Sequence, residues 1–132
     1  MSRTKRMTWA AVVIYVAAFW AWLFWTCSAS AAPSWQYTKA TWYGPGFYGN
    51  GMACGGTYTI KTRGIAHPSL PCGTRVTIVR RGVVTRVTVR DRSGGAFDLS
   101  ARTAMDLCNC WSPYTMNVRW TRGWYYGSAV RL

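Results

Sequence analysis

The sequence predicts a mainly β protein: a small barrel of short strands with one short helix, preceded by an apolar N-terminal helix. Three observations lead to this prediction. Residues 33–132 contain several short runs in which polar and apolar side chains alternate, as they do in half-buried strands. One later stretch has the start signal of a helix, and many of the chain's 13 glycines stand between the runs. Short strands, one helix and glycine-rich loops in a domain of this size are typical of a small β-barrel.

The N-terminal segment has the pattern of a targeting sequence. Positive charges within residues 3–6 precede Met7 to Cys27, an uncharged and mostly apolar run. The small residues that follow fit cleavage by a signal peptidase after Ala31 or Ala32. An uncleaved anchor is the alternative, since the run is long enough to span roughly 30 Å of hydrocarbon. Cleavage is favoured because the Ala-x-Ala pattern stands in the right place.

The chain therefore divides into residues 1–32, a signal peptide or membrane anchor, and residues 33–132, a single domain. We expect this domain to be exported, either secreted or placed in the cell wall or periplasmic space. It would touch a membrane only through an uncleaved N-terminal segment. A monomer is expected.

The charge of the chain is strongly one-sided. It has 16 Lys and Arg against three acidic residues, and its formal net charge is +13. Such a charge favours an anionic partner. Export argues against nucleic acid, so anionic cell-wall polymers or a membrane surface are better matches. The plainer alternative is that the charge only aids solubility.

Four cysteines fall in the exported part: Cys54, Cys72, Cys108 and Cys110. An even number in a small exported domain favours two disulfides. Three pairings are possible; Cys54 with Cys72 closes a loop of medium length, whereas a bridge between Cys108 and Cys110 would be strained, so crossed pairings stay open. The lone His67 stands in no zinc-like cluster, so we expect neither a metal nor a cofactor.

The first predicted strand runs from Pro33 to Tyr43, where aromatic and polar side chains alternate. Residues 44–51 follow as a glycine-dense loop, which indicates positive φ angles or close approach of another backbone. Aromatic rings interleaved with these glycines suit a groove that binds a ligand. The candidate substrate-binding rings are those of Trp42, Tyr43, Phe47 and Tyr48.

Alternation also predicts the remaining strands. Residues 64–73 form an irregular segment whose path is fixed by two prolines. Strands are predicted at 75–79, 83–90, 116–120 and 129–132, the first two joined by a hairpin turn at Arg81-Gly82. A helix over 101–107 is predicted from Ser100, a good N-cap.

The stretch from Asp91 to Ser100 is the best candidate for the chemistry, because carboxyl groups are scarce in this chain and two of the three fall here. Alternation places Asp91 on the apolar face at a strand end, where burial raises a carboxyl pKa and the neighbouring arginines lower it. Asp98 precedes the helix, whose dipole should make it more acidic. Asp106 is expected on a solvated face of the helix.

Three segments carry a resemblance to a known family. They are residues 40–51 (ATWYGPGFYGNG), residues 66–76 (AHPSLPCGTRV), and Asp91-Arg92 followed by residues 97–100 (FDLS). In this order and spacing the chain resembles the rare lipoprotein A (RlpA) family, whose relatives include the expansins and a family of endoglucanases. The resemblance covers about residues 40 to 107. It implies a six-stranded double-psi β-barrel with an open groove across it.

The resemblance also implies an activity. RlpA-like members cleave the glycan strands of peptidoglycan by lytic transglycosylation, preferentially where stem peptides have been removed. Expansin-like members bind and loosen polysaccharides without hydrolysis. We expect a peptidoglycan lytic transglycosylase; a non-catalytic expansin-like wall-binding module is the alternative, and a β-glucan hydrolase is a third, weaker reading.

Site residues follow from the same resemblance. Asp91 matches the Asp of the family's Asp-Arg-Gly-Pro segment and His67 the His of its Ala-His-x-x-Leu-Pro segment, both implicated in RlpA-type activity. Asp98 matches the Asp-Leu-Ser segment that expansins and the related glucanases need. Thr41 stands where expansin-like proteins have a groove Thr or Ser, and is a candidate for substrate binding.

Two departures from the family pattern affect the assignment. Relatives often have a Glu shortly after the glycine loop, where residues 53–57 carry no carboxylate, and Ser93-Gly94 replaces the Gly-Pro. The missing Glu favours the binding-module alternative. We expect Asp98 to act as acid and base, with Asp91 or His67 orienting groups and stabilising charge. The reverse choice, Asp91 as the acid, stays open.

Overall fold

The structure is a computed structural model that describes residues 13–16, 19 and 31–130. The chain forms two compact units, Met1–Ala31 and Ala32–Leu132. In the first unit residues 13–16 and 19 are helical. Among the residues described, no helix combines the length and apolar character needed to cross a membrane. The prediction of a signal peptide or anchor over residues 1–32 falls mostly outside the described part of the chain.

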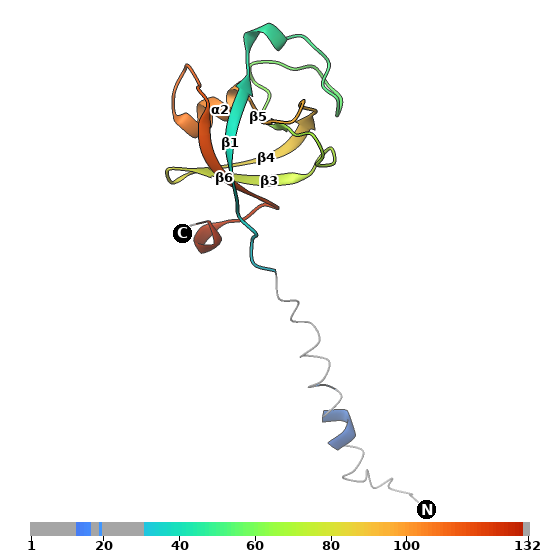
Figure 1. Cartoon of the computed structure of the whole chain (residues 1–132). Coiled ribbons are helices and arrows are strands. Elements are labelled where there is room, and N and C mark those ends of the chain that lie inside the picture. Colours follow the sequence, from blue (N-terminus) through green and yellow to red (C-terminus); the bar gives the residue numbers. More distant parts are fainter. Residues whose placement is uncertain (1–12, 17–18, 20–30, 131–132) are drawn as a thin grey trace, which may run out of the picture. The chain divides into compact units, whose positions relative to one another are not determined.

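The second unit is a closed barrel of six strands in the order β1-β5-β2-β4-β3-β6 (Figure 1). The strands are β1 Gln36–Tyr43, β2 Ile65–Ala66, β3 Arg75–Arg80, β4 Val83–Asp91, β5 Phe97–Ser100 and β6 Met116–Arg122. The β1–β5 and β2–β4 pairs are parallel and the other four pairs are antiparallel. With the short helix α2, Ala101–Cys108, this closed mixed barrel confirms the predicted fold class.

The barrel interior is filled by apolar side chains from all six strands and from α2. The cluster contains Ile65, Ile78, Val89, Leu99 and Leu107, each with no solvent exposure. Burying side chains of this size stabilises the fold by about 1.5–3 kcal/mol each. The barrel wall is therefore held from within, and its outer face is free to carry polar groups.

A second, smaller cluster lies on the other face of the strands. It consists of Tyr43, Met52, Tyr58 and Ala66, with Tyr48 packed against it. The hydroxyl of Tyr58 donates a hydrogen bond to the carbonyl of Tyr43 (2.7 Å) and accepts one from the backbone N–H of Ala101 (2.8 Å). In the structure the glycine-dense loop continues through residues 52–58, and these contacts fix it to β1 and to the start of α2.

The start of α2 is built as the sequence predicts. Ser100 has an extended backbone and its hydroxyl accepts a hydrogen bond from the N–H of Thr103, which makes it the N-cap. Asp106 forms ion pairs with Arg63 (3.2 Å) and Arg102 (3.1 Å) on the helix surface.

The hairpin turn at Arg81-Gly82 is also confirmed, with positive φ angles at both residues (47° and 82°).

Two strands were missed by the prediction and one predicted strand was wrong. The two-residue β2 lies inside the segment predicted as irregular, and the four-residue β5 runs directly into α2. Both are too short for alternation to reveal. The strand predicted at 129–132 is wrong where the structure describes it, because Gly127–Ala129 is a 3-10 helix. Gly127 has a φ of 60°, a left-handed backbone conformation that does not occur in an extended strand.

Both disulfides are present: Cys54 pairs with Cys72, and Cys108 pairs with Cys110. The crossed pairings left open by the sequence are thus excluded. The first bridge joins the glycine-dense loop to the loop after β2. The second closes a short ring just after α2.

Candidate active site

Four neighbouring strands place the predicted polar residues in one row. Thr41 of β1 is paired with Asp98 of β5, Asp98 with Ala66 of β2, and Ala66 with Asp91 of β4. Paired residues in a sheet present their side chains on the same face. Because adjacent strands lie about 4.8 Å apart, the backbones of the two aspartates are separated by roughly 10 Å, with the small Ala66 between them.

The position of Asp91 in this row depends on an irregularity in β4. Ile65 pairs with Val89, but the next residue, Ala66, pairs with Asp91, so Arg90 is an extra residue on β4. Such a β-bulge reverses the alternation that follows it. Val89 faces the barrel interior, yet Asp91 lies on the outer face with Ala66. The prediction that Asp91 shares the apolar face of β4 was therefore wrong.

Asp98 is half-buried beside the outer aromatic cluster. The hydroxyl of Thr41 donates a hydrogen bond to its Oδ1 atom (3.0 Å). Burial raises the pKa of the Asp98 carboxyl above its ordinary value; the negative charge of Asp91 adds to this, and the Thr41 hydrogen bond opposes it. The prediction that the dipole of α2 makes Asp98 more acidic was wrong, because desolvation is the larger effect.

Asp91 serves a different structural purpose. Its Oδ1 atom accepts hydrogen bonds from the backbone N–H groups of Ala53 and Arg92, both at 2.8 Å. The neighbouring residue Cys54 donates from its backbone to the carbonyl of Arg90 (3.2 Å). The carboxylate of Asp91 thereby fastens the glycine-dense loop to the end of β4.

The next residue, Arg92, fastens the second loop. Its Nη1 atom donates to the carbonyls of His67 (3.0 Å) and Leu70. Since the Cys54–Cys72 disulfide joins the two loops, Asp91 and Arg92 together hold a single covalently linked rim beside the row. The sequence analysis missed Arg92 as a site residue, although the Asp-Arg pair was part of the family resemblance.

His67 lies apart from the two carboxylates. Its ring packs edge-on against Phe97 (6.0 Å) and Trp120 (5.8 Å), two residues of the barrel interior. Its Nδ1 atom accepts hydrogen bonds from the N–H groups of Ser69 (3.2 Å) and Leu70 (3.1 Å). Burial and two nearby arginines lower the pKa of His67, so the neutral ring with its proton on Nε2 is favoured. His67 thus shapes the loop, and the row does not include it.

The predicted substrate-binding aromatics differ in how accessible they are. Phe47 is 55% exposed and rests edge-on against Tyr43. Trp42 is partly buried against the barrel interior, and Tyr48 is partly buried on Tyr58. Tyr43 is buried, and its hydroxyl has no hydrogen-bond partner among the described residues. Of the four rings, Phe47 is the one best placed to stack on a ligand.

Tyr58 is a further residue that the sequence analysis missed. Burial raises its pKa to about 12, although the N–H of Ala101 opposes this effect. Burial also raises the pKa of Tyr43, helped by the charges of Tyr58, Asp91 and Asp98. Both phenols therefore stay protonated at neutral pH. The available signal for Tyr58 was its place two residues after the Gly55-Gly56 pair.

The site offers one carboxyl group suited to proton transfer. Asp98 has a raised pKa, and one of its oxygen atoms is held by Thr41. A carboxyl group whose pKa is raised holds its proton more readily than an ordinary aspartate does, which suits it to donate a proton and to take one back. Within the described residues, no three His, Cys, Asp or Glu side chains come together as ligands of a metal ion.

Comparison with known proteins shows which family and which relatives this chain is similar to. The family model described as lytic transglycolase matches residues 36–120. An uncharacterized protein of Synechocystis sp. is 43% identical over 73 residues, covering 54% of this chain and 81% of that protein.

Two further relatives carry functional names. The Probable endolytic peptidoglycan transglycosylase RlpA of Synechocystis sp. is 41% identical over 71 residues, or 49% of this chain. The Endolytic peptidoglycan transglycosylase RlpA of Campylobacter jejuni is 38% identical over 58 residues, or 44% of this chain. The matches span only 22% and 21% of the lengths of these two proteins.

Proposed function

Because this chain belongs to the lytic transglycolase family of double-psi β-barrels, we propose that its barrel cleaves peptidoglycan glycan strands by lytic transglycosylation, with Asp98 as acid and base. The observation that carries the proposal is the half-buried Asp98 carboxyl, whose pKa is raised by desolvation and whose Oδ1 atom is held by Thr41. A single carboxyl group is enough for this chemistry, whereas hydrolysis commonly uses two.

The reaction needs no water. Protonated Asp98 donates its proton to the glycosidic oxygen as the bond from that oxygen to the anomeric carbon of the muramyl ring breaks. The Asp98 carboxylate then accepts a proton from a hydroxyl group of the same ring while that hydroxyl oxygen bonds to the anomeric carbon. The products are a glycan with a new free hydroxyl and an anhydro-muramyl end. Asp98 recovers its proton for the next cycle.

The surrounding residues have supporting roles in this proposal. Thr41 occupies Oδ1, so that the mobile proton resides on Oδ2 and faces the substrate. Asp91 and His67 act by position: Asp91 holds the rim and adds negative charge near the developing positive charge on the sugar, and His67 shapes the loop after β2. Among the aromatic candidates, exposed Phe47 provides a stacking surface, and buried Tyr43 with partly buried Trp42 and Tyr48 supports it from beneath.

The proposed substrate sets the location and the partners. Peptidoglycan lies outside the cytoplasmic membrane, so the barrel would act after export, free or tethered by the N-terminal segment.

The second candidate function is that of a wall-binding module of the expansin type. It is favoured by one observation: residues 53–57 bring no carboxylate to the rim, so Asp98 would have to act without a second acid.

Digestion of stem-peptide-free peptidoglycan with the full-length chain, followed by mass spectrometry, tests the proposal. We expect anhydro-muramyl products from the wild type and a loss of at least about 10²-fold in their rate of formation for Asp98→Asn. Asp106→Asn is the matched control, because it makes the same chemical change on the surface of α2 and should retain activity. Binding to sacculi without product release from the wild type would contradict the enzyme and leave the binding module.

A further inference from the structure

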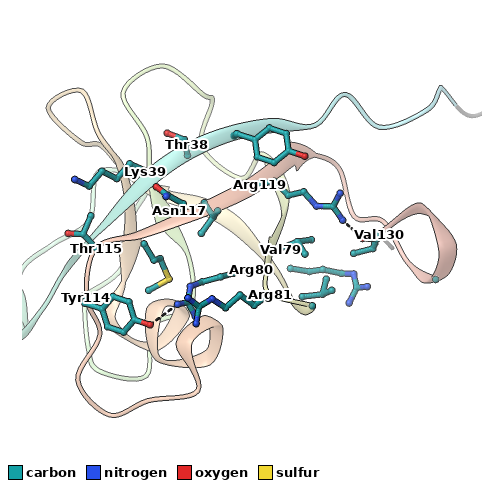
Figure 2. A pocket seen from close by; sticks show the side chains of 17 residues that line it. Thr38, Lys39, Val79, Arg80, Arg81, Tyr114, Thr115, Asn117, Arg119 and Val130 are labelled. Atoms are coloured by element: carbon teal, nitrogen blue, oxygen red, sulfur yellow. Dashed lines mark hydrogen bonds between the residues drawn. The ribbon is translucent and has the colours of Figure 1, made fainter. Parts of the chain in front are cut away.

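A basic groove lies on the barrel wall, and none of the residues of the carboxylate row lines it (Figure 2). It has a volume of about 1580 Å³ and is lined by residues of β1, β3, β4 and β6, the β3–β4 turn and the C-terminal segment. Five of its lining residues are cationic: Lys39, Arg80, Arg81, Arg86 and Arg119. None is acidic. We call this feature the basic groove.

The chain has no acidic side chain left to neutralise these cations. Its three acidic residues are Asp91 and Asp98, which belong to the carboxylate row, and Asp106, which is paired with Arg63 and Arg102. Five like charges gathered in one concave surface repel one another, and a bound anion would relieve that repulsion. The distribution of charge therefore points to an anionic ligand.

Three of the arginines are already held in place. Arg86 donates to the carbonyl of Tyr125 (2.7 Å) and lies over the ring of Tyr126 (3.9 Å to its centroid). Arg119 donates to the carbonyl of Val130 and lies over an aromatic ring. A guanidinium group has five N–H donors, so each of these arginines keeps donors for a ligand. Groups held in advance lose less conformational entropy when they bind.

Arg80 is held from the opposite side of the groove. Its Nη2 atom donates to the hydroxyl of Tyr114 (2.6 Å), as the dashed line in Figure 2 shows. The guanidinium also lies over the Tyr114 ring, 5.3 Å from its centroid. Lys39 and Arg81 complete the set from β1 and from the hairpin turn. The cations therefore come from several strands and surround the hollow.

We propose that the basic groove binds a phosphodiester-linked polymer of polyols or sugars, and so holds the barrel on the anionic polymers of a cell wall. Arginine forks match the two free oxygens of a phosphodiester. A polymer with one charge on each short repeat can meet several of the five cations within one groove. A glycan with a carboxylate on every second ring supplies fewer charges over the same length.

Two other polyanions fit the groove less well. Binding of single-stranded nucleic acid uses successive bases stacked on several open aromatic faces. Of the two aromatic rings that line the groove, Tyr114 is covered by Arg80 and only Tyr37 is open. An anionic bilayer is a broad surface, and cations recessed in a groove meet it poorly compared with protruding ones. A thin flexible chain enters the groove without either difficulty.

The basic groove lies next to the candidate active site along β1. Lys39 and Thr41 are two residues apart and therefore on the same face of the strand, about 7 Å from each other. A wall polymer held in the groove would keep Asp98 close to the glycan. Binding in the groove breaks no bond, so this inference does not depend on the proposed transglycosylase activity.

The test measures binding of the full-length chain, in a mild non-ionic detergent, to labelled poly(glycerol phosphate) at several salt concentrations. Lys39→Gln with Arg81→Gln removes two groove cations that hold no hydrogen bond to the described residues. We expect affinity to fall about tenfold and the slope of log K against log salt to decrease by about 1.4, the value for two lost phosphate contacts. Lys61→Gln with Arg122→Gln removes the same charge outside the groove, and should change both quantities much less.

Competition identifies the ligand. Unlabelled poly(glycerol phosphate) should displace the label at lower charge concentration than polygalacturonate, oligo(dT), or micelles containing phosphatidylglycerol. Stronger displacement by any of these three would overturn the proposal in favour of a carboxylated glycan, a nucleic acid or a lipid surface. Equal loss of affinity in the two double variants would overturn the groove as the site. Binding retained by Asp98→Asn, whatever its activity, keeps this result separate from the proposed function.

Discussion

Thr41 and Asp98 lie directly opposite each other in the parallel β1–β5 pair, and the Thr41 hydroxyl donates a hydrogen bond of 3.0 Å to Asp98 Oδ1. This contact opposes the effect of burial, which raises the pKa of the carboxyl. The register of two strands therefore tunes the proton affinity of the one carboxyl group suited to acid and base work. The pH dependence of the reaction should therefore depend on this contact.

Thr41→Val should move the pH dependence of the reaction. The change removes a hydrogen bond that favours the charged carboxylate, so the pKa of Asp98 rises further. The first step needs protonated Asp98, and the rate falls as pH rises through that pKa; the falling limb should therefore shift to higher pH. The measurement is the pH profile of anhydro-product formation. Thr38→Val, a change on the other face of β1, is the control, and an unshifted limb in Thr41→Val would contradict the role given to Thr41.

His67 should be replaceable by a residue that supplies only the Nδ1 acceptor. The amide oxygen of Asn can take the place of Nδ1 and accept the N–H groups of Ser69 and Leu70, whereas the longer Gln places its oxygen near Nε2. We expect His67→Asn to keep most of the activity and His67→Gln to lose about tenfold or more. Both are measured by initial rates. Equal, large losses in the two variants would show that Nε2 takes part in the chemistry.

The pH dependence of stability should show the lowered pKa of His67. Because its pKa is lower in the folded chain than its ordinary 6.5, the unfolded chain binds the proton more readily. Stability is thus fully present above pH 6.5 and declines as pH falls below it. Urea unfolding at several pH values measures this effect. The free energy of unfolding of the wild type should decline below pH 6.5 through this group, and that of His67→Asn should lack this decline.

Tyr58→Phe should destabilise the barrel by about 1–3 kcal/mol, since it leaves the buried N–H of Ala101 without its acceptor and the carbonyl of Tyr43 without its donor. Chemical denaturation with an unchanged m-value would measure this loss. Tyr48→Phe is the matched control and should alter stability by less than about 0.5 kcal/mol. A small effect in Tyr58→Phe would mean that the loop is fixed by packing alone.

The two disulfides should differ in their contribution to stability. Cys54 and Cys72 are 18 residues apart, so removing their bridge by double substitution to Ala should cost about 3 kcal/mol. Cys108 and Cys110 are two residues apart, and the same treatment should cost about 1 kcal/mol. The free energy of unfolding of the two double variants gives the comparison. The reverse order would contradict the view that the first bridge holds the rim.

The sequence was enough to predict the barrel and its helix, and the roles given to the candidate site residues stay predictions. Ser100 as N-cap and the Arg81-Gly82 turn follow from local chemistry, which short segments carry by themselves. Asp98 and Thr41 were found through scarcity of carboxylates and through the family resemblance. That they form a hydrogen bond depends on the β1–β5 register, a long-range property.

What the sequence could not supply arises from the tertiary structure. The face of Asp91 depends on the bulge at Arg90, which alternation along one strand cannot reveal. The direction of the pKa shift of Asp98 depends on burial under the aromatic cluster, and local helix-dipole reasoning gave the opposite sign. The basic groove gathers cations from four strands, so net charge indicated an anionic partner without locating its site.

The central claim, that Asp98 drives an intramolecular cleavage, is tested most directly by digestion in water enriched in the heavy oxygen isotope. Stem-peptide-free glycan is treated with the full-length chain, and the new muramyl ends are analysed by mass spectrometry. The account predicts anhydro ends that are lighter by one water than hydrolysis products and carry no heavy oxygen. Reducing muramyl ends that contain the heavy isotope would contradict it, because they require attack by water.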